Sequence, residues 1–336
     1  MNLSLLNTPW YIKQLKTQAS RDSDPIAFSY TEQQIERLQP VQWDAREIAL
    51  PVDRDALVGQ SEVFGVDVDT SDIVSPMQWT LEGRAYSQDF NMLQVADQAV
   101  LDLLIQNARN GWERPVYFAV TVSPDGQLDL QNFFQLEGLA YRVVPIEHDE
   151  YGGRVVPEIQ LDRLSKFRLT NLDDPDVYFD ENIRRMTDNY RNIYAITADQ
   201  LIDQGMTTEA RALLDSLNQA MPFETIPATY PQSVFSLVSI YNRLDATDTV
   251  NELLGKIEPQ VLHQLEYPRT SREAQRSAEY ANLLRQYYLQ NGAFEEAAAF
   301  SDGMAVALRD SSYRFSADEL RRLYQEAMQA RDAESD

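Results

Sequence analysis

The chain contains two histidines, His148 and His263, so histidine-dependent chemistry would have to use one of them. A serine–histidine–aspartate relay needs such a base, and α/β-hydrolases place the serine in a G-x-S-x-G turn. That pattern is absent from the sequence, as are the phosphate-binding patterns G-x-x-x-x-G-K-[ST] and G-x-G-x-x-G. We therefore expect neither a hydrolase triad nor a nucleotide-binding loop.

Two acidic stretches resemble parts of metal sites. His148–Glu150 offers an imidazole beside two carboxylates, but a solvated polar loop explains it equally well, and we favour the loop. Asp67, Asp69 and Asp72 are spaced like the start of a calcium loop. An EF-hand needs glycine at its sixth position and glutamate at its twelfth, whereas Asp72 and Gln78 stand there.

Carboxylates are too numerous to identify a catalytic pair. Glycoside hydrolases use two carboxylates at a fixed separation, and 53 acidic residues neither locate nor exclude such a pair. The sequence has no cysteine, which excludes disulfides, thiolate zinc ligands and a cysteine nucleophile. We assign no catalytic residue, no metal and no cofactor from the sequence.

Aromatic side chains recur in the helical segments and have two interpretations. They can line a groove for peptide or sugar, or fill the core between helices with their hydroxyls at the rim, and we favour the core. The residues concerned are Trp10, Tyr11, Tyr190, Tyr194, Tyr241, Tyr280, Tyr287 and Tyr288.

Three arginines lie close together before the first clear helical hairpin. Arg184, Arg185 and Arg191 are near Asn189 and Tyr190 and could line an anion or carbohydrate site, although pairing with neighbouring acids is the interpretation we favour. The candidate contacts for a ligand or partner are Asn7, Trp10, Tyr11, Arg184, Tyr190 and Arg191.

The segment Tyr190–Pro222 predicts the element around which the C-terminal half is built. Two amphipathic helices meet at Gly205, as in a tetratricopeptide hairpin, and the same spacing recurs twice. In each case a large apolar residue is followed by a turn residue four positions later and a small apolar residue five after that. The three sets are Leu201-Gly205-Ala210, Tyr241-Asp245-Val250 and Tyr288-Gly292-Ala297.

The repeats are degenerate, because the turn residues lie 40 and 47 positions apart, longer than the roughly 34 of a regular tetratricopeptide repeat. We expect a further helix at 178–192 before them and a capping helix at 315–330 after them.

The N-terminal half predicts strands as well as helices. A helix is expected from Met92 to Gly111, followed by a buried strand at 116–122, a short helix ending near Gly138 and a second strand at 140–146. Strand, crossover helix and strand would form a βαβ-like unit. The fold prediction is an α/β domain over 1–172, incomplete at its N-terminus, and an all-α domain of tetratricopeptide-like hairpins over 176–331.

The beginning of the chain is harder to interpret. Leu3–Leu6 has the character of the end of a buried strand, and Thr8 and Pro9 predict a helix start. A strand so close to Met1 leads us to expect that the chain is part of a longer protein. Residues 21–90 predict long loops with short strands, for example at 62–68.

The charge excludes one class of partner. The net charge of −24 repels nucleic acid and anionic lipid. Only four of the 29 basic residues are lysines, a balance typical of proteins adapted to high salt, so we expect a higher melting temperature in molar salt. No apolar run approaches the ~18 residues that span a bilayer, and no signal peptide opens the chain, so we expect a soluble protein.

The opening NLSLLNTPWYIKQL resembles a segment of bacterial protein O-mannosyltransferase-like membrane proteins, multi-spanning proteins of the glycosyltransferase-C type whose function is largely unknown. Further similar segments are RPVYFAVTV at 114–122, EGLAYRVVP at 137–145 and NIRRMTDNYRN at 182–192. The resemblance implies a C-terminal region at the periplasmic face of the inner membrane, partnered by the membrane-embedded part of the same chain. The catalytic acid of that family is expected between early membrane helices, so no catalytic residue can be placed on this sequence.

Three functions remain open. The favoured one is a non-catalytic accessory domain of a membrane glycosyltransferase-like protein that binds the acceptor protein or a glycan. The second is a free-standing scaffold whose helical groove binds a peptide. The third is a soluble carboxylate enzyme acting on sugars. A reading frame with many hydrophobic segments upstream of Met1 would favour the first, and turnover of a sugar by the purified chain would favour the third.

Overall fold

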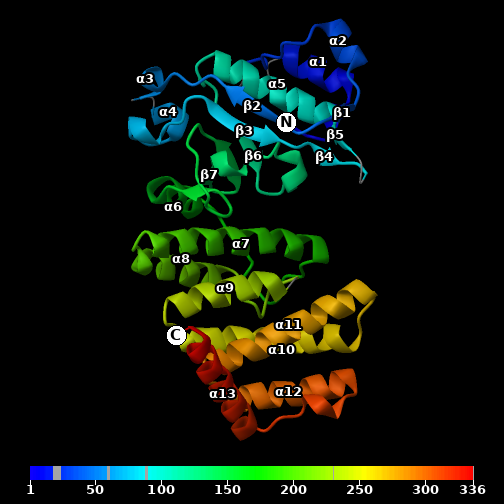
Figure 1. Cartoon of the computed structure of the whole chain (residues 1–336), viewed down its shortest axis with the longest axis vertical. Coiled ribbons are helices and arrows are strands. Elements are labelled where there is room, and N and C mark those ends of the chain that lie inside the picture. Colours follow the sequence, from blue (N-terminus) through cyan, green and yellow to red (C-terminus); the bar gives the residue numbers. More distant parts are fainter. Residues whose placement is uncertain (18–23, 59–60, 88–89, 230, 336) are drawn as a thin grey trace. The chain divides into compact units, whose positions relative to one another are not determined.

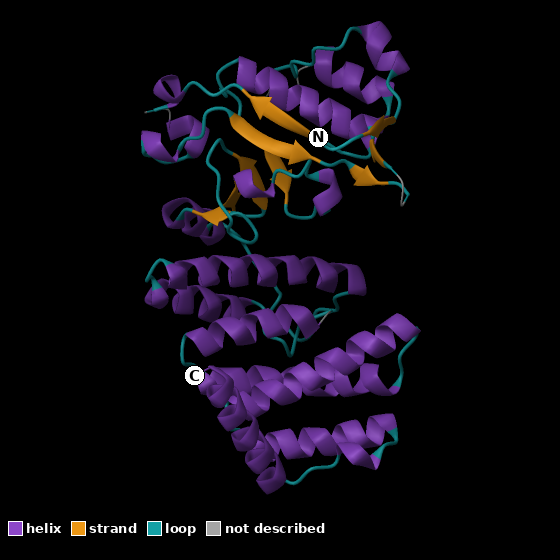
Figure 2. Ribbon diagram, in the orientation of Figure 1, coloured by secondary structure: helices purple, strands orange, loops and turns teal. Residues whose placement is uncertain are grey.

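The computed structural model describes residues 1–17, 24–58, 61–87, 90–229 and 231–335. The chain forms two compact units, Met1–Phe167 and Arg168–Asp336. Strands occur in the first unit, and the described part of the second is helical (Figures 1 and 2). The predicted combination of an α/β region followed by an all-α region is confirmed. Within the described residues, no helix is long and apolar enough to cross a membrane.

The described part of unit 1 contains three small sheets. Strands β1 (Val41–Trp43), β5 (Asn91–Leu93) and β4 (Arg84–Ala85) form one, and β2 (Arg46–Leu50) pairs antiparallel with β3 (Met77–Leu81) in the second. The third has the order β6-β8-β7-β9, with β6 at Tyr117–Ala119, β8 at Ala140–Val143, β7 at Phe134–Glu137 and β9 at Arg154–Val155. Its pairings are antiparallel except for β7 with β9.

Six α-helices accompany these sheets in the described part of unit 1: α1 (Pro9–Thr17), α2 (Glu32–Arg37), α3 (Arg54–Leu57), α4 (Ser61–Phe64), α5 (Val95–Arg109) and α6 (Pro157–Ser165). Short 3₁₀ helices lie at Leu5–Asn7, Thr70–Asp72, Pro124–Gly126 and Gln131–Phe133. The core includes Leu6, Ile12, Leu104 and Phe133, each at most 2 % exposed.

The predicted βαβ-like unit is wrong. The segment expected to be a helix before Gly138 forms a 3₁₀ turn and strand β7, which makes an antiparallel hairpin with β8. All four residues of β7 are buried, including Gln135 and Glu137, so the polar residues that gave the segment a helical pattern lie inside. The expected strand at 116–122 is reduced to the three residues of β6.

Two other N-terminal predictions also fail. Leu3–Leu6 is not the end of a strand, because the chain forms a 3₁₀ helix at Leu5–Asn7 with Leu6 fully buried. The strand expected at 62–68 is replaced by the short helix α4, after which Gly65 turns the chain with a φ of 78°. The helix starting at Pro9 is confirmed. The helix expected from Met92 begins at Val95, because Asn91–Leu93 pairs with β1.

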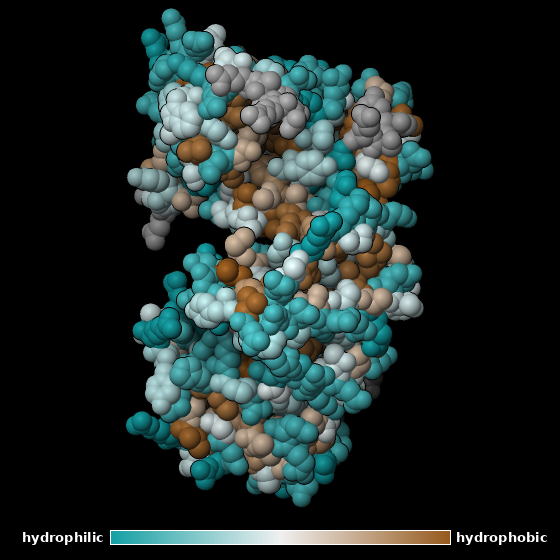
Figure 3. All heavy atoms as spheres, turned by 180° about the vertical axis from the view of Figure 1, so that it is seen from behind, coloured by the Kyte–Doolittle hydropathy of each residue, from teal (hydrophilic) through white to brown (hydrophobic). Residues whose placement is uncertain are grey.

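Unit 2 consists of three helical hairpins and a last helix. The pairs are α7 (Glu181–Asp203) with α8 (Thr207–Ala220), α9 (Pro231–Arg243) with α10 (Thr247–Glu266), and α11 (Ser271–Gln290) with α12 (Phe294–Leu308). A 3₁₀ turn at Ser311–Tyr313 leads to α13 (Ala317–Ser335). The separate helix expected at 178–192 is continuous with α7. On the face in Figure 3, hydrophilic residues cover most of this unit and hydrophobic atoms lie in separate patches.

The turn residues of the hairpins explain the spacing in the sequence. Gly205, Asp245 and Gly292 have left-handed backbone angles, with φ of 79°, 53° and 71°. At each turn the residue that follows donates its N–H to the carbonyl of the large apolar residue, as from Met206 to Leu201 at 2.8 Å. This is the Schellman motif, which fixes the apolar residue four positions before the turn. The small residues Ala210, Val250 and Ala297 are fully buried, as predicted.

Candidate functional site

The candidate contacts at the N-terminus have partners within unit 1. The side-chain oxygen of Asn7 accepts a hydrogen bond from the N–H of Ala96 at 3.0 Å, which caps the first turn of α5. The Tyr11 hydroxyl accepts one from the N–H of Asn2 at 3.1 Å. Trp10 is 56 % exposed, and its ring meets that of Tyr11 edge-on at 5.5 Å. Asn7 and Tyr11 therefore hold the chain's beginning in place, while Trp10 faces solvent.

Arg191 lies inside unit 2, where it fastens a linker to α7. It is 1 % exposed, and its guanidinium donates to Asp188 at 3.2 Å and to the carbonyl of Ile226 at 2.5 Å. The same group lies 4.2 Å from the ring of Phe223. Asp188 in turn accepts from the N–H of Thr229 at 2.9 Å. The buried pair therefore fixes residues 221–229, the linker between α8 and α9.

The other two candidate ligand contacts on α7, Arg184 and Tyr190, lie outside the Arg191–Asp188 contacts given above. Arg184 is half-buried, and its Nε has no hydrogen-bond partner among the described residues. Tyr190 is half-buried as well. Four of the eight aromatic residues interpreted as core are confirmed as such, since Tyr194, Tyr241, Tyr280 and Tyr288 are at most 8 % exposed. The other three tyrosines are half-buried, and for the exposed Trp10 the interpretation was wrong.

A polar pocket of about 340 Å³ lies in unit 2 beside the fixed linker. Asp215 and Asn218 are three residues apart and share a face of α8, and Thr249, Glu252 and Lys256 share a face of α10. The linker closes the pocket between these faces. The lining residues are Asp215, Asn218, Pro222, Phe223, Glu224, Thr249, Glu252, Leu253 and Lys256.

A buried tyrosine organises the α8 side of this pocket. The Tyr241 hydroxyl accepts from the Asn218 amide at 2.7 Å and donates to Asp215 at 3.1 Å. Burial and the nearby charge of Asp215 raise the pKa of Tyr241, so the phenol remains a donor. The hydroxyl thus occupies one oxygen of Asp215 and holds Asn218 in a fixed orientation.

An ammonium group links the opposite side to the linker. The Lys256 amine lies 2.9 Å from a Glu224 oxygen and 2.6 Å from a Glu252 oxygen. The hydrogen bond from Lys256 lowers the pKa of Glu224. Burial opposes the charge of Lys256, but its hydrogen bonds to the two glutamates outweigh burial and raise its pKa. Glu224 and Lys256 therefore stay ionised near neutral pH.

The pocket wall has a second anchor besides Arg191. The Gln260 side-chain amide on α10 donates to the carbonyl of Ala228 at 3.1 Å. The linker is thus tied to α7 through Arg191 and Asp188 and to α10 through Gln260. Because the linker is held at both ends, Pro222, Phe223 and Glu224 do not have to be ordered when a ligand binds.

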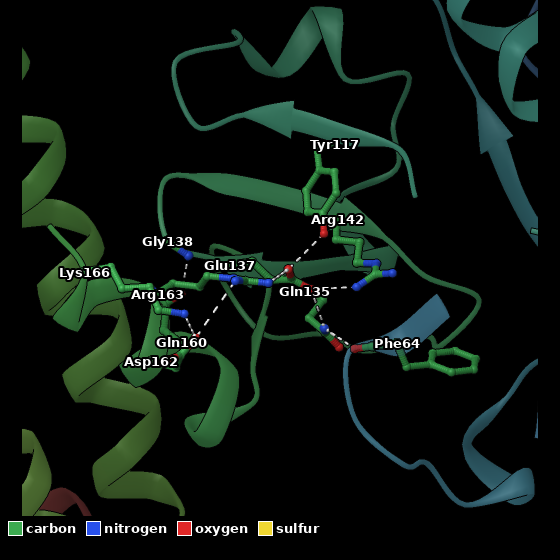
Figure 4. A network of polar contacts seen from close by, with 10 residues as sticks. All are labelled: Phe64, Tyr117, Gln135, Glu137, Gly138, Arg142, Gln160, Asp162, Arg163 and Lys166. Carbon is green, nitrogen blue, oxygen red and sulfur yellow. Dashed lines mark hydrogen bonds and ion pairs between the residues drawn. The ribbon is translucent and has the colours of Figure 1, made fainter. Parts of the chain in front are cut away.

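Unit 1 contains a second polar cluster, the Glu137 network, shown in Figure 4. The Glu137 side chain is 3 % exposed. One of its oxygens accepts from Gln135 at 2.9 Å and from Arg142 at 3.2 Å, and the other accepts from the Tyr117 hydroxyl at 2.9 Å. Arg163 on α6 forms an ion pair with that second oxygen at 3.8 Å.

Both side-chain oxygens of Glu137 are engaged by residues of the network. Gln135 also donates to the carbonyl of Phe64 at 2.7 Å, which ties the strand to the end of α4. Burial is the main cause that raises the pKa of Tyr117, which therefore stays protonated and keeps donating. With donors on both oxygens, Glu137 has little capacity left to take a proton from a substrate. The network holds β6, β7, β8 and α6 together and is a structural centre.

His148 does not form the metal site considered from the sequence. One ring nitrogen lies 2.7 Å from the carbonyl of Phe134, and the other accepts from the N–H of Glu150 at 3.2 Å. Burial lowers the pKa of His148, consistent with a neutral ring that donates once and accepts once. Across the described ranges, no group of three or more histidine or acidic residues is arranged to hold a metal ion.

A smaller pocket of about 200 Å³ lies in unit 1, between the end of α5 and residues 113–117. Its walls include Ile26, Leu103, Val116 and the ring of Tyr117. The Tyr117 hydroxyl is already engaged with Glu137. We therefore regard the pocket beside α8 and α10, in which ionised and amide groups converge, as the candidate functional site.

Sequence reasoning missed the residues of this site. Asp215, Asn218, Tyr241 and Lys256 come from two hairpins, and a linker between them completes the pocket. One signal was present: the first interval between turn residues exceeds a regular repeat, so extra residues had to lie between the first two hairpins.

Comparison with known proteins gives one match. The family model described as TMEM260-associated domain 2 matches residues 41–160, which lie within unit 1 and include Glu137, Tyr117 and Arg142. Two of the segments that carried the resemblance in the sequence, 114–122 and 137–145, fall inside the match. No curated protein and no solved structure matches the chain.

Proposed function

We propose that this chain is an accessory domain of a membrane glycosyltransferase-like protein and that unit 2 binds the protein that accepts the sugar. The observation that carries the proposal is the polar pocket beside α8 and α10, an open site with a fixed wall. Two features support the proposal: the volume falls within the roughly 300–1,000 Å³ typical of ligand pockets, and charged and amide groups converge on it.

The family match supports the membrane context of this proposal. TMEM260 is described as an O-mannosyltransferase-like membrane protein, and the domain that matches residues 41–160 is associated with it by name. In this proposal unit 1 connects the membrane-embedded part of the protein to unit 2, at the periplasmic face in a bacterial cell. The Glu137 network holds the strands β6, β7 and β8 and the helix α6 of unit 1 together.

Serine and threonine hydroxyls are the acceptors in O-linked transfer, so an accessory domain of this kind binds extended segments that contain them. The test uses the full chain and a short fluorescein-labelled Gly-Ser-Thr peptide, followed by fluorescence anisotropy. We expect saturable binding and no transfer of mannose from polyprenyl-phosphate mannose. Transfer by the purified chain alone, or the absence of peptide binding, would contradict the proposal.

A further inference from the structure

The pocket beside α8 and α10 has more hydrogen-bond acceptors than donors. Asp215 uses one oxygen for the Tyr241 hydroxyl, and each glutamate uses one oxygen for Lys256. The second oxygens of Asp215 and Glu252 accept no hydrogen bond within the described residues, whereas Glu224 also accepts one from its own backbone N–H. A carboxylate accepts through both oxygens, so the pocket suits a ligand that brings several donors.

The charges in the pocket also favour a cationic ligand. Three carboxylates, Asp215, Glu224 and Glu252, face one ammonium, Lys256, which is shared by the two glutamates. The nearest further cation on α8 is Arg211, one turn before Asp215, and its guanidinium donates to the carbonyl of Leu244 at 2.5 Å. Among the ion pairs of the described chain, none involves Asp215, so its charge is available to a ligand.

Acidic side chains alone would not make a site in a protein of net charge −24. These acidic residues differ from the others of the chain because they line a cavity and are held in place by buried residues. Tyr241 is fully buried, and its hydroxyl orients Asp215 and Asn218 through hydrogen bonds. The Arg191–Asp188 pair fixes the position of the linker that carries Phe223. The acceptors are therefore held in place around the open pocket before a ligand arrives.

We infer that this pocket receives the guanidinium or ammonium group of an arginine or lysine side chain of the bound peptide, with Asp215 as its main charge partner. The inference rests on the proposed function, since it assumes that unit 2 binds a peptide. Asp215 and Glu224 accept from the cation, and Asn218 lies on the same face of α8 as Asp215. A hydroxyl-rich glycan is the competing ligand.

The test compares three short Gly-Ser-Thr peptides, with a central arginine, lysine or glutamine, by fluorescence anisotropy with the full chain at low salt. We expect the two basic peptides to bind about threefold more tightly than the glutamine peptide, the range of one exposed charge pair. Asp215→Asn and Glu224→Gln should each remove most of this preference. Asp215→Asn keeps an acceptor for Tyr241, so the fold is retained.

Asp302→Asn is the matched control, because it removes one exposed carboxylate of α12 outside the pocket. It should leave the preference unchanged. If all three peptides bind alike, or if the preference survives both pocket variants, the inference is wrong while the proposed function stands. If no peptide binds, both fail. Binding of methyl α-mannoside that is abolished by Asp215→Asn, without a preference for basic peptides, would assign the pocket to a glycan.

Discussion

The two units differ in how the hydrogen-bonding capacity of a carboxylate is used. In unit 1, Glu137 receives donors on both oxygens and lies under the surface. In unit 2, Asp215 receives one hydroxyl and faces an open pocket. The first carboxylate has its hydrogen-bonding capacity used within the fold, and the second keeps capacity for a ligand.

This difference separates a structural role from a recognition role. Removal of a buried carboxylate leaves the charge of its partner unpaired in a medium of low dielectric. The free energy of unfolding therefore falls. An exposed carboxylate can be changed with little effect on folding, so its loss appears in binding. The comparison therefore predicts opposite outcomes for substitutions in the two places.

The largest expected effect is in the Glu137 network. Glu137→Ala leaves the buried guanidinium of Arg142 without its carboxylate and should lower the free energy of unfolding of unit 1 by about 3–5 kcal/mol. All four tryptophans lie in unit 1, so tryptophan fluorescence in a urea titration reports this unit. Asp215→Asn should change the free energy of unfolding of unit 2, followed by circular dichroism, by less than about 0.5 kcal/mol. A Glu137→Ala loss below about 1 kcal/mol would remove the distinction between the two clusters.

The next effect tests the wall of the pocket. Arg191→Met leaves Asp188, 4 % exposed, without its cation and should destabilise unit 2 by about 3 kcal/mol. It should also weaken peptide binding, because the linker loses its bonds from Arg191. Circular dichroism during urea unfolding and peptide anisotropy measure the two changes. Arg185→Met, an exposed arginine on the same helix, is the control and should alter neither. If Arg191→Met bound the peptide as tightly as the unaltered chain, the position of the linker would not contribute to peptide binding.

A smaller effect concerns the hairpin turns of unit 2. Gly205→Ala places a side chain at φ 79°, where no neighbouring atom interferes, so the roughly 1–2 kcal/mol cost is conformational. Gly255→Ala in the middle of α10 also meets open space and should stabilise unit 2 by about 0.5–1 kcal/mol. Circular dichroism should show opposite shifts, and the tryptophan transition of unit 1 should not move. Equal shifts for both variants would contradict the role of the turn.

The smallest effect is a pH dependence confined to unit 1. Burial lowers the pKa of His148 below its usual 6.5, so the unfolded chain takes up a proton before the folded one does. The stability from this group is present above about pH 6.5 and is lost as the pH falls through the folded value. Urea titrations from neutral to mildly acidic pH should show a smaller loss in His148→Gln than in the unaltered chain. Identical slopes would contradict the assigned neutral ring.

The sequence predicted the parts of the fold that local contacts decide. The spacing of Leu201, Gly205 and Ala210 reflects a Schellman turn and one buried small residue, both set within a few positions, so the hairpins were recognisable. Strand β7 was missed because Gln135 and Glu137 are buried by partners distant in the chain, such as Phe64 and Arg163. Phe134–Glu137 does alternate apolar and polar residues, but four residues are too few to separate this alternation from helical spacing.

The candidate site was missed for a related reason. Tyr241 joins Asp215 and Asn218 across two hairpins, and its hydroxyl looks like one more core aromatic in the sequence. Arg191 was singled out as a possible ligand contact, but the structure places it beneath the linker, with its donors on backbone carbonyls and Asp188. Its contribution to a site is to position the wall.

The most direct test of the central claim is amide hydrogen exchange of the full chain with and without the arginine peptide. The account predicts slower exchange in the linker 221–229, the C-terminal part of α8 and the first turns of α10, with no change at residues 117–142 around Glu137. Protection of the Glu137 region instead of the pocket, or bound peptide without protection near α8 and α10, would contradict it.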